Sequence, residues 1–129
     1  MLEAGITNVE TTMVTEQNTA AALGSGTVAV FGTPAMINLI ELTCARSVQD
    51  KLELGQTTVG TNLNVSHDAP TPIGMEVRCT STLAKLDGRA LTFEVEVTDE
   101  TGVVGRGTHG RFIVDEAKFT SKANAKLDN

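Results

Sequence analysis

One long apolar helix is the feature of this sequence that most constrains its fold. Between residues 33 and 51, apolar side chains recur at helical spacing, at Met36, Ile37, Ile40, Cys44 and Val48. Leu39 and Leu42 widen the apolar face beyond a single stripe. A helix of this kind is covered on most sides, so the rest of the chain must supply a broad apolar surface around it.

The start of this helix is marked by Thr33 and Pro34. A threonine oxygen can accept an unpaired backbone N–H at the N-cap, and proline has no N–H to leave unsatisfied at the first helical position. The pair therefore predicts a helix that starts at Thr33, with Thr33 as its N-cap.

Strand patterns follow the helix. Residues 57–66 alternate apolar and polar side chains, which is the period of a half-buried strand. Three more strands are predicted at 75–86, 90–98 and 103–114, joined by turns at Asp87-Gly88 and at residues 99–102. Consecutive hairpins of this kind make an antiparallel meander.

Shorter elements are expected before the helix. Residues 6–14 and 27–31 are predicted to be short strands on either side of a small, flexible stretch at 20–26. At the other end, the tail from about Lys118 is polar and is expected to fray.

These elements predict an α+β fold, an antiparallel β-sheet wrapped around one long central α-helix. A chain of 129 residues has the size of one domain, so residues 1–129 are expected to form a single domain. The free edge strands of such a sheet invite pairing with a second copy of the chain.

Composition argues against several classes of protein. A net charge of −6 disfavours nucleic-acid binding, which needs a basic surface. No run approaches the ~18 apolar residues of a membrane span, and the N-terminus does not resemble a signal peptide. Cys44 and Cys79 lie in periodic segments, which indicates buried free thiols instead of a disulfide or zinc site. We expect a cytoplasmic protein with no nucleic-acid or membrane partner and no metal.

The chain has two histidines, His67 and His109, so imidazole chemistry near neutral pH must use one of them. His67 closes the first strand after the helix and enters a loop stiffened by Pro70 and Pro72, where functional side chains are often held. A histidine that simply ends a surface strand is an equally good interpretation.

Glu41 stands in the middle of the apolar helix. Unless it is paired, burial should push its pKa upward, toward the range of a catalytic carboxylate. The alternative is that Glu41 lies on one exposed stripe with Asn38 and Arg46. Thr33 has a similar pair of interpretations, because its hydroxyl lies where a helix start can bind a carbonyl oxygen, yet an N-cap needs no catalytic role.

Three further residues are candidates for substrate binding. Gly60 interrupts a β-branched strand, which indicates either an oxyanion donor or a bulge. His109 and Arg111 share one strand face by period two, so they are a predicted phosphate or pantetheine contact or else solvated strand residues.

Taken together, these residues resemble a known family. From residue 28 to residue 118 the sequence is similar to the hotdog thioesterases of the fluoroacetyl-CoA thioesterase type. Order and spacing agree at Val30-Phe31-Gly32-Thr33, Glu41, Val59-Gly60-Thr61, Val65-Ser66-His67, Pro70-Thr71-Pro72-Ile73-Gly74 and Gly105-Arg106-Gly107-Thr108-His109.

The resemblance implies a hotdog fold and hydrolysis of an acyl-CoA thioester to free acid and CoA, with no separate cofactor. It implies Thr33, Glu41 and His67 as the catalytic set, and Gly60 as a residue that positions the thioester carbonyl or the attacking water. The fluoroacetate-specific enzyme has phenylalanines in a lid before the helix, where this chain has Gly24-Ser25-Gly26-Thr27. We therefore expect a small or medium acyl-CoA as the substrate.

The expected mechanism uses Glu41 and His67 to activate either water or the Thr33 hydroxyl, with His67 then protonating the CoA thiolate. Eight helical residues separate Thr33 from Glu41 by about 12 Å along the axis, so one helix does not easily bring both to one carbonyl. We expect a homodimer, alone or as a dimer of dimers, with groups from both chains in each site.

Two other functions fit the same fold. An enoyl-CoA hydratase would use an Asp/His pair, for which Asp68 beside His67 is the candidate, although neighbours on a strand point to opposite faces. A non-catalytic acyl-CoA-binding domain would keep the fold without turnover.

Overall fold

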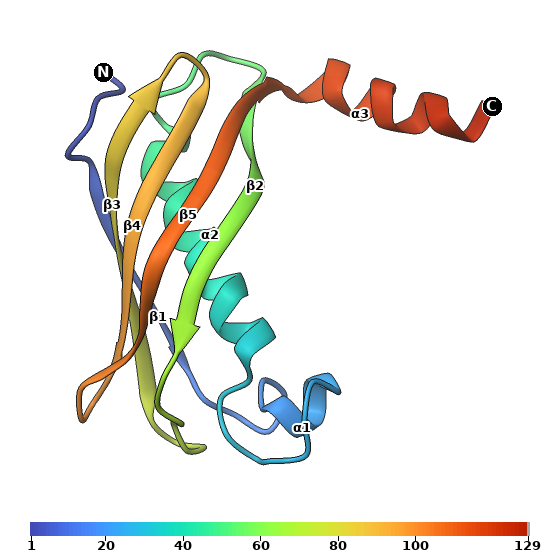
Figure 1. The fold of residues 1–129 in the computed structure, drawn as a ribbon. Helices are drawn as coiled ribbons and strands as arrows, with labels where there is room; N and C mark the ends of the chain where they lie inside the picture. Colours follow the sequence, from blue (N-terminus) through green and yellow to red (C-terminus); the bar gives the residue numbers. More distant parts are fainter. Residues whose placement is uncertain (129) are drawn as a thin grey trace.

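Five strands and three helices, with a closing 3-10 turn, make up the fold in the computed structural model, which describes residues 1–128. In chain order they are β1 (Thr7–Met13), α1 (Ala20–Leu23), α2 (Thr33–Gln49), β2 (Gln56–His67), β3 (Glu76–Asp87), β4 (Ala90–Asp99), β5 (Val103–Asp115), α3 (Glu116–Asn124) and the turn Ala125–Asp128. Figure 1 shows α2 lying across one face of the curved sheet. The expected α+β arrangement is confirmed.

The sheet has the strand order β1-β3-β4-β5-β2, and each pair is antiparallel. Strands β3, β4 and β5 form the predicted meander. By contrast, β2 does not pair with β3, which follows it in sequence, but lies beside β5 at the edge of the sheet. Residues 68–75 between β2 and β3 contain two prolines and make no tight hairpin, so the chain crosses to the far side of the meander.

The core lies between α2 and the facing side of the sheet. From α2 it receives Met36, Leu39, Ile40, Cys44 and Val48, all nearly or fully buried. The strands contribute every second residue, as in β4, where Leu91, Phe93, Val95 and Val97 are buried and their neighbours are exposed. This burial explains why the apolar face of α2 is so broad.

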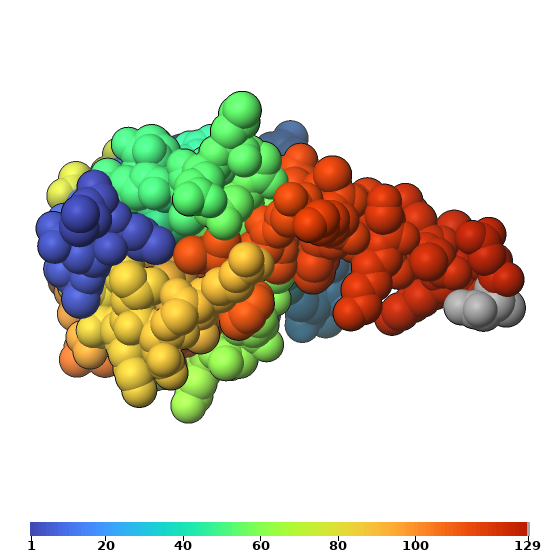
Figure 2. All heavy atoms as spheres, turned by 90° about the horizontal axis from the view of Figure 1, so that it is seen from above, coloured from blue at the N-terminus to red at the C-terminus, as the bar shows by residue number. Residues whose placement is uncertain are grey.

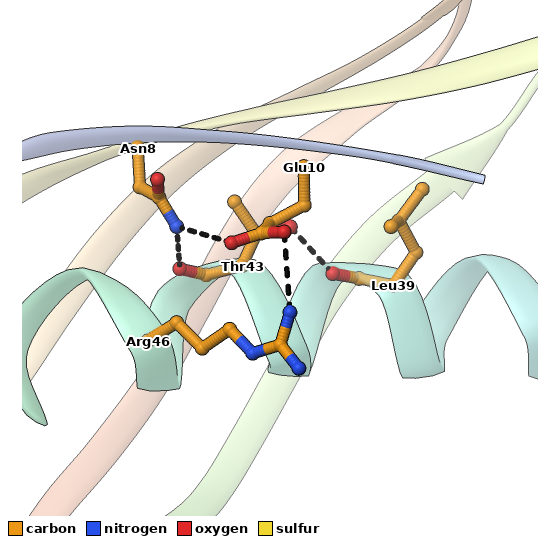
Figure 3. A network of polar contacts seen from close by, with 5 residues as sticks. All are labelled: Asn8, Glu10, Leu39, Thr43 and Arg46. Carbon is orange, nitrogen blue, oxygen red and sulfur yellow. Dashed lines mark hydrogen bonds and ion pairs between the residues drawn. The ribbon is translucent and has the colours of Figure 1, made fainter.

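Polar contacts tie the edge strand β1 to α2 (Figure 3). The Asn8 side-chain amide donates to the Thr43 carbonyl at 3.1 Å and to Glu10 at 3.1 Å. Arg46 pairs with the same Glu10 carboxylate at 3.3 Å. Arg46 therefore serves the β1–α2 contact.

Two expectations about irregular segments are wrong. Residues 27–31 form no strand, because only isolated bridges join Val30 to Pro72 and Phe31 to Thr19. The stretch at 20–26 contains the short helix α1, whose N-cap Thr19 accepts from the Ala22 N–H at 3.1 Å. The polar tail forms helix α3, which Asp115 caps by accepting from the Lys118 N–H at 3.0 Å, and its fraying stays a prediction.

Among residues 1–128, no helix is long and apolar enough to cross a membrane.

Cys44 and Cys79 are free and fully buried, as expected, and should resist modification in the native protein. Burial raises the pKa of the Cys44 thiol to about 12 and that of Cys79 to about 11, which leaves little reactive thiolate at pH 8.

A chromogenic disulfide reagent should label neither thiol before unfolding in guanidinium and both afterwards. A Lys85→Cys variant, with a thiol on the exposed end of β3, should gain one site that reacts at once. Rapid labelling of the native wild type would contradict the buried positions.

Candidate active site

Thr33 and His67 form the first half of the candidate site. The Thr33 hydroxyl lies 2.7 Å from Nδ1 of His67. Thr33 is the first residue of α2, and Gly32 takes the N-cap position without a side-chain hydrogen bond. The prediction that Thr33 caps the helix is therefore wrong, and its hydroxyl is free to pair with the histidine.

The His67 ring suits the acceptance of a proton from Thr33. Burial lowers the pKa of His67 below its ordinary value, although the charge of Asp68 opposes this effect, so the ring is mainly neutral at pH 7. When Nδ1 accepts from the hydroxyl, the ring proton is on Nε2. That atom is buried and has no hydrogen-bond partner within residues 1–128.

Glu41 belongs to a second group of residues farther along α2. Its side chain is 45% exposed, and its Oε2 lies 3.5 Å from Nη1 of the buried Arg111. The carboxylate is thus paired and half exposed, not unpaired and buried, and Asn38 and Arg46 are exposed as well, as the alternative interpretation expected. Arg111 holds the carboxylate at the surface between α2 and β2.

Arg111 and His109 are buried, so the interpretation as solvated strand residues is wrong. The guanidinium of Arg111 donates to the Thr58 hydroxyl at 2.8 Å and to the Thr58 carbonyl at 2.9 Å. It also lies 3.1 Å from Nε2 of His109, whose Nδ1 lies 2.8 Å from the Asn62 carbonyl. A carbonyl only accepts and a guanidinium only donates, which assigns the ring proton of His109 to Nδ1.

Gly60 provides the space in which this second group meets. A side-chain carbon at Gly60 would lie 2.8 Å from Oε2 of Glu41 and 3.3 Å from the His109 ring. The register between β2 and β5 also shifts between Gly60 and Asn62, so the predicted bulge is confirmed. A role for Gly60 as an oxyanion donor stays a prediction.

The chain thus forms two separate groups beside β2, Thr33 with His67 and Glu41 with Gly60, His109 and Arg111. No hydrogen bond or ion pair within the described residues joins one group to the other. A pocket of about 200 Å³ opens beside the second group, between Ile37 and Glu41 of α2 and residues 60–63 of β2. A larger hollow of about 560 Å³ lies over β3, β4 and β5, but none of the predicted site residues lines it. The pocket beside β2 therefore belongs to the second group, and Thr33 and His67 are not among the residues that line it.

Thr58 is the site residue that sequence reasoning missed. It holds Arg111 through two contacts, and it is almost fully buried. Its position two residues before Gly60 on the same strand was an available signal, because residues two apart share a strand face. Within residues 1–128, no cluster of three His, Cys, Asp or Glu side chains is arranged to hold a metal ion.

Folding stability should fall as the pH drops below about 6.5 toward the lowered histidine pKa values. Burial lowers the pKa of His109, with a smaller contribution from Arg111, so the unfolded chain binds protons before the folded chain does. In this window each such histidine contributes at most about 1.4 kcal/mol per pH unit.

A His109→Gln variant should show a shallower pH dependence of stability than wild type. Glutamine is neutral and keeps one donor for the Asn62 carbonyl and one acceptor for Arg111. Urea unfolding curves at pH 5, 6 and 7 provide the measurement, and the comparison cancels the titration of other groups. Equal slopes for the two proteins would show that His109 does not titrate differently on folding.

Comparison with known proteins identifies a family that the chain resembles. The sequence profile of a family described as fluoroacetyl-CoA-specific thioesterase matches residues 14–117. The chain is also 37% identical over 97 residues to the fluoroacetyl-CoA thioesterase of Streptantibioticus cattleyicolor, which covers 75% of this chain and 70% of that protein.

Solved structures agree with this match. A structure of the fluoroacetyl-CoA thioesterase FlK superposes with a TM-score of 0.93 at 30% identity, over 98% of both chains. A thioesterase superfamily member from Thermus thermophilus gives 0.91 at 26% identity, over 99% of this chain and 95% of that one. A hot-dog-like protein from Thermanaerovibrio acidaminovorans gives 0.88 at 19% identity, covering 97% and 93% of the two chains, which supports the fold alone.

Proposed function

The chain belongs to the fluoroacetyl-CoA-specific thioesterase family, and from this premise we propose that it hydrolyses a small or medium acyl-CoA to free acid and CoA. The observation that carries the proposal is the 2.7 Å contact between the Thr33 hydroxyl and His67 at the start of α2. This contact pairs a nucleophile with a base at the positive end of a long helix. No group beyond the CoA of the substrate is needed.

The proposed reaction begins when Nδ1 of His67 takes a proton from the Thr33 hydroxyl, or from a water in its place. The oxygen then attacks the thioester carbonyl, and the carbon–sulfur bond breaks as the thiolate takes the proton from His67. If Thr33 is the nucleophile, a water hydrolyses the acyl-threonine in a second, similar step. The positive end of α2 at Thr33 is proposed to help stabilise the oxyanion, although Pro34 has no N–H to donate and the Met36 N–H is already bonded to the Gly32 carbonyl.

Glu41 and Gly60 enter the reaction if the site is shared between two chains. The edge of β2 away from β5 pairs with no other strand of the described chain, and it is twelve residues long. Two copies can therefore pair antiparallel along β2. A twofold axis at Asn64 would place His67 opposite the partner's Thr61, next to the partner's Gly60 at the bulge, and so near the partner's Glu41.

In this homodimer the partner's Glu41 orients the attacking water or the His67 ring, and the N–H of the partner's Gly60 is a second oxyanion donor. His109 and Arg111 are buried within their own chain, so they contribute to binding by positioning Glu41. A further pairing of dimers into a tetramer is compatible with this arrangement.

Substrate choice depends on the segment before α2. Residues 24–27 carry no aromatic side chain and are exposed, so the entrance to the Thr33 side is open. We propose a general acyl-CoA substrate on this basis. The reduced thiols of Cys44 and Cys79 suit a reducing compartment, and the cytoplasm is the proposed location.

The Asp/His pair of the hydratase alternative does not form. Asp68 accepts from the Ser66 hydroxyl at 2.7 Å, whereas His67 pairs with Thr33. The geometry therefore favours the hydrolase over the hydratase.

Release of free CoA is the direct test of the proposed activity. Substrates from acetyl-CoA to decanoyl-CoA, with fluoroacetyl-CoA and an aromatic acyl-CoA, should include at least one that is turned over. His67→Ala and Thr33→Val should lower kcat by roughly 100-fold or more, because general base catalysis is typically worth that much. Thr33→Ser is the matched control and should keep most of the activity. If folded protein binds acyl-CoA and releases no CoA from any substrate, the non-catalytic binding domain replaces this proposal.

Complementation between two inactive variants tests the shared site. His67→Ala and Glu41→Gln should each be inactive, but a mixed dimer of the two has one intact site made of His67 from one chain and Glu41 from the other. Random mixing by joint refolding should restore about a quarter of wild-type activity. Light scattering on the same samples measures whether dimers form. No recovery from proteins that do form mixed dimers would show that each site uses a single chain.

A further inference from the structure

Helix α3 stands away from the body of the molecule. It follows β5 directly, and its first N–H, from Glu116, donates to the Gly55 carbonyl at 3.0 Å. From there it runs past the start of β2 and beyond the open edge of the sheet (Figure 1). Figure 2 shows the same helix as an arm that projects from the body, and none of its residues is buried.

An arm of this kind is incomplete by itself. A helix of nine residues is not stable alone in water, even with a good N-cap. Phe119 is 47% exposed on α3 and lies one turn before Ala123, and Leu127 in the closing 3-10 turn is 85% exposed. The arm thus presents an apolar side to solvent in the single chain.

The position of α3 points to a second copy of the chain as its partner. Asp115, at the base of α3, pairs with Gln56 at the start of β2, whereas His67 ends β2 beside Thr33. Segment α1 lies at this second end (Figure 1). Antiparallel pairing along β2 places the start of one strand beside the end of the other, so it brings α3 of each protomer toward α1 of its partner.

The two surfaces are complementary. The segment at residues 20–28 exposes Leu23 by 45% and Val28 by 59%, which offers an apolar surface to the apolar side of α3. Charge supports the same pairing: residues 1–115 contain seven basic and fourteen acidic residues, whereas the tail contains three lysines and two acidic residues. The side chains of the tail thus carry a net charge of +1 against −7 for residues 1–115, which favours association with a second copy, although residues 20–28 themselves carry no charged side chain.

We propose that α3 is an intersubunit arm that docks on residues 20–28 of a second copy of this chain, beside that copy's Thr33 and His67. The proposal rests on the homodimer proposed above. It makes the partner's arm one wall of the entrance through which the acyl-CoA reaches Thr33, so dimer formation and the shape of the entrance are coupled.

Disulfide trapping between two variants tests the contact directly. Leu23→Cys and Phe119→Cys proteins, distinguished by tags of different mass, are mixed, allowed to exchange subunits and oxidised mildly. The native thiols are buried and do not take part. A mixed disulfide that disappears on reduction is expected. Val9→Cys replaces Leu23→Cys in the control, because Val9 is similarly exposed at 49% but lies on β1 at the opposite edge of the sheet.

Trapping of the Leu23→Cys and Phe119→Cys pair at about ten times the level of the control or more supports the contact between α3 and residues 20–28 of a second copy. Two outcomes overturn the proposed contact of α3 with a second copy and leave the dimer in place. One is a wild-type dimer without selective trapping. The other is a disulfide that a Leu23→Cys/Phe119→Cys double variant forms within one chain. A wild-type monomer in light scattering overturns the dimer and the arm together. The CoA-release assay decides the proposed activity independently of these outcomes.

A second variant measures what the arm contributes. Phe119→Ser should weaken the dimer by about tenfold in dissociation constant, as expected for one buried aromatic anchor. Val9→Ser removes an exposed apolar side chain of similar exposure from the far edge and should leave the dissociation constant unchanged. Equal effects of the two variants would overturn the proposal.

Discussion

Burial of α2 against the curved sheet fixes the position of every residue in the candidate site. Met36, Ile40 and Val48 are fully buried on this helix, and complete burial of each such side chain stabilises the fold by roughly 1.5–3 kcal/mol. The helix therefore cannot rotate or slide without a large loss. Thr33, Ile37 and Glu41 are spaced by four residues, so they follow one side of the helix. Contacts of Thr33 with His67 and of Glu41 with Arg111 place that side beside β2 and β5.

The charge of Arg111 is the costly part of this arrangement. A buried guanidinium destabilises a fold unless its donors are satisfied, and here Thr58, His109 and Glu41 satisfy them. These partners come from β2, β5 and α2, so one side chain couples three elements. Because Gly60 has no side chain, Glu41 and His109 can approach the strand at the same point. The bulge next to Gly60 and the ion pair are thus parts of one local structure.

Much of the fold follows from periodicity, whereas the pairing of distant segments does not. The helix and four long strands were predicted to within one or two residues, because their apolar spacing is regular and glycine turns separate the strands. The position of β2 beside β5 could not be predicted, since no local signal records which strand lies next to which.

The same limit applies to the site. Thr33, Glu41 and His67 are visible through a family resemblance, but the contact of Thr58 with Arg111 depends on the register across a bulge. The N-cap rule for Thr33 failed because a nearby histidine competes for the hydroxyl.

The division of the polar residues into two groups follows from the geometry of a single helix beside a single strand. Thr33 and Glu41 are about 12 Å apart along α2, too far for one thioester carbonyl to contact both. Each group is also incomplete in a different sense: Nε2 of His67 is buried and has no hydrogen-bond partner among residues 1–128, whereas the Glu41 carboxylate is half exposed next to an open strand edge. In the proposed homodimer, a twofold axis through that edge would bring an unlike group from the partner toward each group. One polypeptide would then keep Thr33 and Glu41 apart while folding and bring Thr33 to the partner's Glu41 on association. Activity would depend on the dimer, and any element that strengthens the β2 edge contact would also stabilise the site.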